Sequence, residues 1–329
     1  MSSAVIRLGY VHLRVTDLEE AREHYSNTLG MEVVEEDQGK LYLKCWDEWD
    51  HHSLVLEEGG VGLVKFGYKV ESPDDLAIFE ERAQKFGATT GRVSAGENLK
   101  VGEAVSITLP SEQTLELYTD MEFSGTETGS INPEAWPRHV RGVGTHWIDH
   151  ALIPAEDPGL VERFMNEVLD FKTAERVVES MENPAVIGSW MSCGESPHDL
   201  AVIKGPNDKL HHFAYHLEDW NAILRAGDIF SMDDVPIDIG PTRHGITRGT
   251  TIYFFDPAGN RNEVFAGLGY RVQPDFPTIN WTVDHLAHIY NKLGIDSHAE
   301  LVARSKVAFD AEHLARNRIA LLESRDGAP

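Results

Sequence analysis

The sequence predicts an α+β protein with two domains, each built from a pair of β-α-β-β-β modules, and a helical C-terminal extension. Three observations support this prediction. A chain of 329 residues has room for two domains of ordinary size. Short β-rich runs alternate with single helical segments, and this order recurs along the whole chain. A stretch in which Gly, Ser, Thr, Asn and Pro replace the periodic pattern separates the two halves.

The first two modules occupy the N-terminal half. Asp17, followed three residues later by Glu20, predicts the start of a helix that ends at Gly30. The second helix begins at Pro73 and ends before Gly87. Around these helices we predict strands at residues 6–15, 31–35, 40–46, 52–56, 61–70, 105–109 and 114–118.

The second half repeats this plan from Gly144. A helix is predicted around residues 159–169, and the fourth module opens at 210–217 and closes at 262–266. We therefore expect a metal-free domain, a linker, a metal-binding domain and an extension at residues 1–121, 122–141, 142–270 and 271–329. In the extension, residues 281–293 and 298–322 are predicted to be helical, and solvated helix faces should carry its histidines, His285, His288, His298 and His313.

Charge and cysteine content exclude several classes of protein. Acidic side chains outnumber basic ones by 54 to 29, which gives a formal net charge of −25. This charge repels phosphate polymers and anionic lipids, so we expect neither a nucleic-acid nor a membrane partner. No apolar run reaches the roughly 20 residues that cross a bilayer, and the N-terminus lacks a signal-peptide pattern. Cys45 and Cys193 form no CxxC motif, which excludes a disulfide framework and favours a cytoplasmic location.

Internal repetition separates a few of the sixteen histidines from the rest. Aligning the halves places His150 opposite His12, His212 opposite Lys65, and Glu263 opposite Glu116. The interval from position 65 to 116 equals the interval from 212 to 263, which supports this alignment. A protonated lysine cannot coordinate a metal ion, so the first half should be metal-free.

The second half therefore offers a candidate metal site made of His150, His212 and Glu263. Two imidazoles and one carboxylate with open positions form the ligand set of non-haem Fe(II) enzymes that handle dioxygen. Structural zinc instead closes four positions, often with sulfur.

Neighbouring histidines need separate assignments. His146 shares a strand face with His150, and the repeat register favours His150. His211 should point to the face opposite His212, where it would pack or support the ligands, and His216 is expected at a solvated strand end.

The stretch 242–263 carries a motif with many fixed positions. It reads Thr242-Arg243-His244, seven residues, Ile252-Tyr253, two residues, Asp256-Pro257-Ala258-Gly259, three residues, and Glu263. This motif resembles the signature of type I extradiol dioxygenases of the vicinal oxygen chelate superfamily. The resemblance extends over nearly the whole chain, and the strongest likeness is to catechol 2,3-dioxygenases that act on single-ring catechols.

The resemblance implies that His150, His212 and Glu263 hold Fe(II), with Mn(II) possible because related enzymes use it. It implies extradiol cleavage of catechol or alkyl-substituted catechols with O₂, which gives 2-hydroxymuconate semialdehyde-type products. It also implies a homotetramer.

Further roles follow from the same resemblance. The stretch 196–201 matches the strand that bears the acid–base histidine, which falls on His198. His244 and Tyr253 match a hydrogen-bonding pair near the substrate and oxygen. The resemblance also places candidate pocket walls at Trp190, Ile246 and Thr247.

Two other enzyme classes and one non-enzyme class remain open at this point. A glyoxalase-like isomerase would use zinc or nickel with an additional carboxylate ligand. A hydroxyphenylpyruvate-type dioxygenase would not need His244 and Tyr253 beside Glu263. An aromatic-compound binding or resistance protein of the same fold would not need an open metal site.

Overall fold

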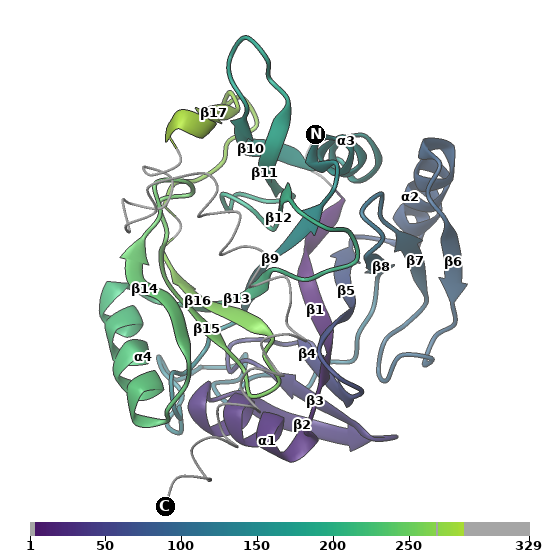
Figure 1. The fold of residues 1–329 in the computed structure, drawn as a ribbon. Helices are drawn as coiled ribbons and strands as arrows, with labels where there is room; N and C mark the ends of the chain where they lie inside the picture. Colours follow the sequence, from purple (N-terminus) through teal and green to yellow (C-terminus); the bar gives the residue numbers. More distant parts are fainter. Residues whose placement is uncertain (1–3, 268, 286–329) are drawn as a thin grey trace, which may run out of the picture.

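The computed structural model describes residues 4–267 and 269–285 and contains two open mixed sheets (Figure 1). The eight-stranded first sheet has the order β2-β3-β4-β1-β5-β8-β7-β6. Its strands are β1 (Val5–Val15), β2 (Glu32–Asp37), β3 (Lys40–Lys44), β4 (Leu54–Glu58), β5 (Gly62–Val70), β6 (Thr90–Val93), β7 (Ala104–Thr108) and β8 (Thr114–Tyr118). Its helices are α1 (Leu18–Glu23), the π-helix η1 (His24–Thr28) and α2 (Pro73–Phe86).

The nine-stranded second sheet has the order β14-β15-β16-β13-β9-β12-β11-β10-β17. Its strands are β9 (Ile148–Ala155), β10 (Lys172–Val178), β11 (Val186–Ser192), β12 (Leu200–Lys204), β13 (His212–Leu217), β14 (Ile237–Arg243), β15 (Thr250–Phe255), β16 (Arg261–Ala266) and β17 (Ile279–Thr282). Its helices are α3 (Pro158–Leu169), α4 (Trp220–Met232) and the 3-10 turn η2 (Val283–His285).

The predicted module plan is confirmed. Each module places its first strand beside its fourth in a parallel pair, as β1 with β4 and β13 with β16. Within each half, the first strands of the two modules pair antiparallel, as β1 with β5 and β9 with β13. Each half therefore joins its two modules edge to edge into one sheet. The domain and linker boundaries drawn from the sequence stay a prediction.

The ends of the helices follow local sequence rules. The Ser72 side chain accepts a hydrogen bond from the Asp75 amide at the start of α2, and Gly87 ends it in a left-handed conformation with φ +104°. Asp17 caps α1 by accepting from the amides of Glu19 and Glu20. The turns that follow α1 form the π-helix η1, which the sequence pattern does not distinguish from an α-helix.

The extension differs from the prediction where the structure describes it. Residues 281 and 282, expected in a helix, belong to β17, which pairs in parallel with β10 at the edge of the second sheet. Backbone pairing with that open edge outweighs the local sequence pattern that predicts a helix here. His285 is exposed, as expected, but lies in the short turn η2 rather than a longer helix. His288, His298, His313 and the helix expected at 298–322 lie outside the described residues.

Side-chain hydrogen bonds connect the two halves of the chain. The Tyr25 hydroxyl donates to Asp256 Oδ2 at 2.8 Å, in the turn between β15 and β16. Asn260, in the same turn, donates to the Arg14 carbonyl at 3.0 Å and accepts from the Gly62 amide at 2.9 Å. The turn that leads into β16 is therefore held by the other half of the chain. None of the helices in the described residues has the length and apolar character needed to cross a bilayer.

Candidate metal centre

Strand register brings the predicted site residues to one face of the second sheet. Ala214 on β13 faces His150 on β9 and Glu263 on β16, and Glu263 in turn faces Tyr253 on β15. His212 lies two residues before Ala214 and therefore projects from the same face. Three neighbouring strands thus direct one potential ligand each to one point, and a fourth strand brings Tyr253 beside them.

The three side chains meet around one carboxylate oxygen. Glu263 Oε2 lies 3.1 Å from His150 Nε2 and 2.9 Å from His212 Nε2. The candidate ligand atoms all lie within 4.8 Å of one another. Each of the three residues is at most 1 % exposed, so bulk water does not solvate these polar groups.

Protonation compensates for the burial of these groups. Burial opposes ionisation of Glu263, but the hydrogen bond from His150 and the adjacent His212 imidazole hold its pKa well below the ordinary value. Burial alone would lower the pKa of His150, and its bonds to Asp149 and Glu263 instead raise it to about 9. Burial lowers the pKa of His212 to about 4, so that imidazole is neutral.

This donor set fits a divalent first-row metal ion. His212 Nε2 is buried and, within the described residues, makes no hydrogen bond of acceptable geometry. A neutral imidazole nitrogen beside a carboxylate has the lone pair that a metal ion requires. An ion that displaces the proton from His150 would meet two imidazoles and one carboxylate.

Several residues behind the ligands were not identified from the sequence. Asp149 Oδ2 lies 2.8 Å from His150 Nδ1, and Thr251 Oγ1 donates to Glu263 Oε1. The expectation that His211 points away from His212 is wrong, because their Nδ1 atoms are in hydrogen-bond contact. His211 precedes β13, so the alternation of the strand does not govern its side chain. The only sequence signal for Asp149 was its position directly before a candidate ligand.

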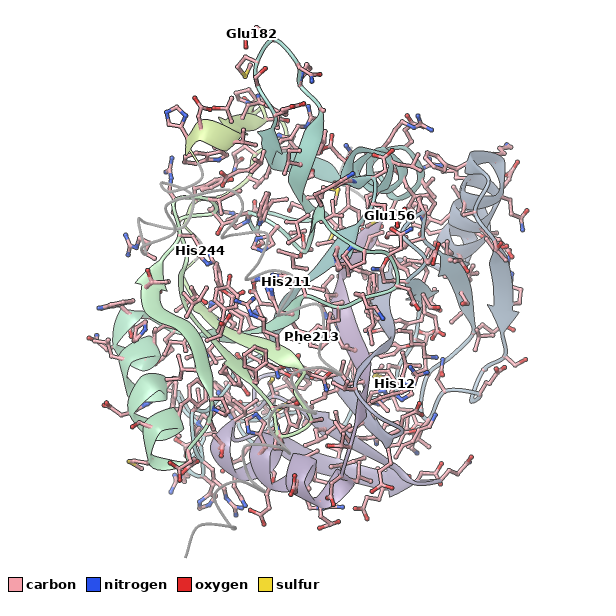
Figure 2. The ribbon with its side chains drawn as sticks, in the orientation of Figure 1. His12, Glu156, Glu182, His211, Phe213 and His244 are labelled. Carbon is pink, nitrogen blue, oxygen red and sulfur yellow. The ribbon has the colours of Figure 1, made fainter. Side chains whose placement is uncertain are left out.

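The remaining predicted site residues lie near the cluster. His198, between β11 and β12, has its ring centroid 3.9 Å from that of His150 and is 3 % exposed. Burial, reinforced by the charge of His150, holds the pKa of His198 well below its ordinary value. The Tyr253 hydroxyl lies 2.8 Å from His244 Nε2, which is 4.0 Å from Glu263 Oε1. In Figure 2, His244 lies near the end of β14 and His211 beside β13.

Comparison with known proteins identifies the family. Residues 147–264 match the Glyoxalase/Bleomycin resistance protein/Dioxygenase superfamily, and residues 65–122 match the catechol 2,3-dioxygenase-like N-terminal domain. The chain is 40 % identical over 290 residues to a metapyrocatechase of Pseudomonas sp. (strain CF600), an alignment that covers 87 % of this chain and 94 % of the relative. The chain belongs to the type I extradiol dioxygenases of the vicinal oxygen chelate superfamily.

Other members of the family extend this likeness. A manganese-dependent 2,3-dihydroxybiphenyl 1,2-dioxygenase of Geobacillus genomosp. 3 is 30 % identical, with 85 % of this chain and 91 % of the relative covered. The solved 2,3-dioxygenase LapB of Pseudomonas sp. KL28 superposes with a TM-score of 0.83 at 41 % identity, covering 87 % of this chain and all of LapB. Homoprotocatechuate 2,3-dioxygenase of Brevibacterium fuscum, solved with 3,4-dihydroxyphenylacetate, gives 0.78 at 26 % identity, with 88 % of each chain covered.

The first half of this extradiol dioxygenase replaces the cluster by an ion pair. Lys65 Nζ lies 2.9 Å from Glu116 Oε2 and 2.6 Å from Asn98 Oδ1, and the Tyr10 hydroxyl also donates to Glu116. The expectation that His12 corresponds to His150 is wrong by two residues, because Tyr10 faces Gly67 as His150 faces Ala214. His12 faces Lys65 and contacts Glu57 at 3.2 Å. The lysine ammonium thus neutralises the carboxylate that corresponds to Glu263.

The candidate pocket walls lie in a buried apolar group beside the centre. Trp190 and Ile246 pack in one cluster with Leu152, the cross-strand neighbour of His212. Thr247 is fully buried, and its amide donates to a carboxylate oxygen of Glu175.

Two other histidines are also buried. His146 packs its ring against Trp46 and Trp136, with centroids 4.8 and 5.5 Å away, and is not part of the cluster. The expectation of a solvated His216 is wrong, because its ring stacks on Trp147 at 3.9 Å and burial lowers its pKa.

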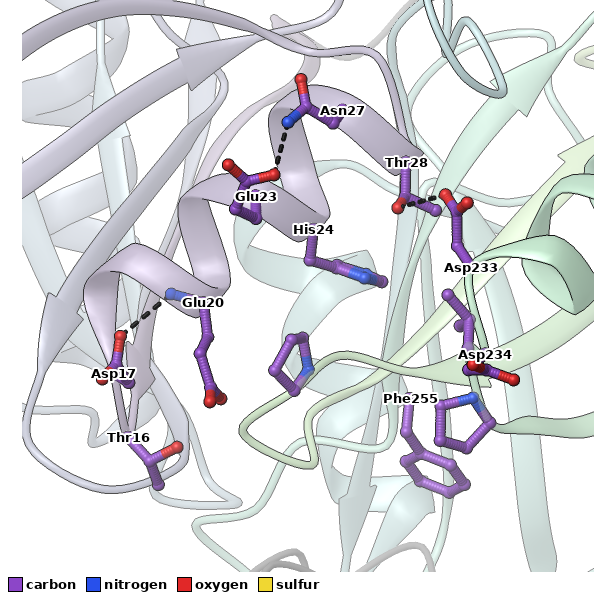
Figure 3. A pocket seen from close by; sticks show the side chains of 13 residues that line it. Thr16, Asp17, Glu20, Glu23, His24, Asn27, Thr28, Asp233, Asp234 and Phe255 are labelled. Atoms are coloured by element: carbon purple, nitrogen blue, oxygen red, sulfur yellow. Dashed lines mark hydrogen bonds between the residues drawn. The ribbon is translucent and has the colours of Figure 1, made fainter.

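A separate cavity of about 680 Å³ lies between α1 with η1 and the turn after α4 (Figure 3). Its wall is rich in acidic groups, but several of these bond to neighbours in the wall. Asp17 accepts from the Glu20 amide, Asn27 donates to Glu23, and Thr28 donates to Asp233. None of the predicted site residues lines this cavity.

Proposed function

We propose that this extradiol dioxygenase uses Fe(II) to cleave catechol, or an alkyl-substituted single-ring catechol, with O₂ at the bond beside the diol. The product would be a 2-hydroxymuconate semialdehyde-type compound. The observation that carries the proposal is the convergence of His150, His212 and Glu263 on one buried point, with His198 and Tyr253 beside it.

In this proposal His150, His212 and Glu263 hold the metal ion, which supplies a place where catechol and dioxygen bind together and exchange electron density. Two neutral imidazoles and one carboxylate would leave a net charge of about +1 on a ferrous centre, which suits a catechol monoanion. A manganese-dependent relative leaves Mn(II) as the alternative ion.

His198 is proposed as the acid–base group. A neutral imidazole has a nitrogen lone pair, with which His198 would accept a proton from a catechol hydroxyl and return it later in the reaction. Within the described residues, its Nδ1 atom has no hydrogen-bond partner, which leaves that atom available to the substrate. The family resemblance assigns Tyr253 and His244 to hydrogen bonds with the substrate and oxygen. The contact between their polar atoms places the two side chains together for this role.

Apolar side chains beside the centre support a small aromatic substrate. Trp190, Ile246 and Leu152 belong to one buried cluster, which we propose as the wall that faces the ring substituent. Thr247 would complete this wall from the same loop as Ile246. Apolar walls favour hydrogen or alkyl substituents over charged ones.

The decisive experiment adds catechol to anaerobically metal-loaded protein and then admits oxygen. We expect oxygen uptake and a yellow product with Fe(II), and neither with the His212→Ala variant, which should also lose the metal. A glyoxalase-like isomerase would consume no oxygen, and a binding or resistance protein would retain catechol unchanged. Either result would contradict the proposed function. Activity with Mn(II) alone would contradict only the choice of iron.

We also propose a homotetramer, on the family resemblance, and a reducing cytoplasmic location, on the two free cysteines. Sedimentation of the metal-loaded protein tests the first of these proposals. A monomer or dimer across the working concentration range would contradict it.

A further inference from the structure

Glu175, on β10, is a buried acidic residue outside the proposed ligand set. It is 1 % exposed, and within the described residues no lysine or arginine lies within ion-pair distance of it. A buried carboxylate without a cation must be stabilised by hydrogen-bond donors. The Glu175 carboxylate therefore depends on its hydrogen-bond donors for stabilisation, and it fixes the positions of those donors in turn.

Three segments supply these donors. The Thr247 amide donates to Oε1 at 2.6 Å, and the Tyr270 hydroxyl donates to the same oxygen at 2.7 Å. Trp281 Nε1 donates to Oε2 at 2.6 Å. One side chain thus joins β10 to the loop that contains Thr247 and to the segment 270–282. These contacts are strong, because hydrogen bonds to an ionised acceptor are stronger than neutral ones.

Strand register places Glu175 on the face that carries the proposed metal centre. Glu175 faces Trp190 on β11, and Trp190 faces Ala201 on β12. Ala201 faces Leu152 on β9, which faces the proposed ligand His212. One row of cross-strand neighbours thus runs from Glu175 through the proposed pocket wall to the centre.

The loop that Glu175 holds is strained. Thr247 and Arg248 are consecutive non-glycine residues in the left-handed region, with φ of +56° and +58°. Such a conformation persists only where surrounding contacts impose it. The same loop carries His244, whose amide donates to the Gly249 carbonyl at 2.9 Å, and so the shape of residues 244–249 determines where the His244 ring lies.

We propose that Glu175 is a positioning residue for the reaction. It holds residues 244–249 in the strained conformation that keeps His244 against Tyr253, and it ties segment 270–282 to that loop. The effect on turnover rests on the proposed function, whereas the effect on the loop does not.

Three variants test the proposal. Glu175→Gln keeps one carbonyl oxygen for Thr247 and Tyr270 but turns an amide N–H group toward the Trp281 N–H, so two donors oppose each other. Adding Trp281→Phe removes the opposing donor and should restore the loop contact. Glu175→Asp keeps the charge and shortens the reach, which provides a second test if the glutamine variant folds poorly.

Glu162→Gln is the matched control. Glu162 is also buried, and it bonds to Arg176, the residue that follows Glu175 on β10, at 2.9 Å. Successive strand residues point to opposite faces, so this change alters a buried carboxylate without touching the loop.

The measurements are metal content, kcat and KM for catechol, and hydrogen exchange of the amides of residues 244–249. For Glu175→Gln and Glu175→Asp we expect unchanged metal content, kcat lower by about tenfold or more, and exchange of the Thr247 amide faster by about tenfold. The double variant should recover most of both losses, and Glu162→Gln should show neither.

Unchanged loop exchange in both single variants would overturn the inference, as would equal acceleration of exchange across the first sheet. An absence of rescue in the double variant would also overturn it. If the parent protein has no dioxygenase activity but the loop responds as expected, the proposed function fails and the positioning role stands.

Discussion

The Nδ1 atom of His150 lies 2.8 Å from a carboxylate oxygen of Asp149, the residue directly before it. An acceptor at Nδ1 fixes the ring and its tautomer, so that Nε2 can present a lone pair to a metal ion. Asp149 therefore orients the ring of His150 for metal binding.

Asp149→Asn should weaken metal binding by about 10- to 100-fold, because an amide supports the imidazole less strongly than a carboxylate does. Anaerobic titration calorimetry with Fe(II) or Mn(II) measures this change. Asp170→Asn, a change of the same chemistry at the exposed C-cap of α3, should bind the metal like the parent. Equal affinity of Asp149→Asn and the parent would contradict the assignment of His150.

His198→Gln should lower kcat by on the order of 100-fold and leave the metal content unchanged, because it removes the proposed proton acceptor without removing a ligand. Steady-state kinetics with parallel metal analysis make this measurement. His146→Gln alters another buried histidine, one that packs between tryptophans, and should retain full turnover. A fully active His198→Gln protein would move the acid–base role to another group.

Lys65→Met should destabilise the protein by about 3 kcal/mol, because it leaves the buried Glu116 carboxylate without its cation. The double change Lys65→Met with Glu116→Gln should recover most of that loss. Urea denaturation measures both values. Metal content should stay at the parent level in both variants, and a single variant as stable as the parent would show that the ion pair contributes little.

His52 should make folding stability depend on pH. Burial, reinforced by His51, lowers the pKa of His52 from 6.5 to about 3 in the folded protein. Between these values the unfolded chain binds the extra proton, so stability rises with pH, is complete above 6.5 and is lost as the pH falls toward 3. At about pH 5 this loss amounts to about 2 kcal/mol.

Urea midpoints of the parent and His52→Gln at about pH 7.5 and pH 5 test this expectation. The variant should lose less stability than the parent on acidification. His139→Gln, a matched change at an exposed histidine in the predicted linker, should behave like the parent. Parallel losses in all three proteins would contradict the assignment.

Local sequence rules predicted much of the fold because they act over short distances. Helix α2 begins and ends where Ser72, Pro73 and Gly87 indicate, since capping depends on neighbouring residues. β17 escaped prediction because its pairing with β10 joins positions about a hundred residues apart in sequence, such as 177 and 281. The local sequence around Trp281 contains no information about that partner.

The sequence likewise predicts one part of the candidate site and not the other. Internal repetition leads to His212 and Glu263, because Lys65 and Glu116 hold the equivalent strand positions in the first half. The same alignment leads to His150 through His12, but the register places Tyr10 at the equivalent position, and a bulge-dependent shift of two residues along a strand is not visible in the sequence. The contact of His211 with His212 depends on where β13 begins, and alternation alone misplaces it. The partners of Glu175 lie 72, 95 and 106 residues away, so no local pattern could reveal them.

The hydrogen bonds that join Tyr25, Arg14 and Gly62 to the turn before β16 limit how the halves of this enzyme could be exchanged between relatives. A chimera that joins the first half of one relative to the second half of another would keep Glu263. It would lose the matched hydrogen bonds that hold the turn leading into its strand. Grafting the catalytic half onto a foreign partner would therefore require transplanting these contact residues as well.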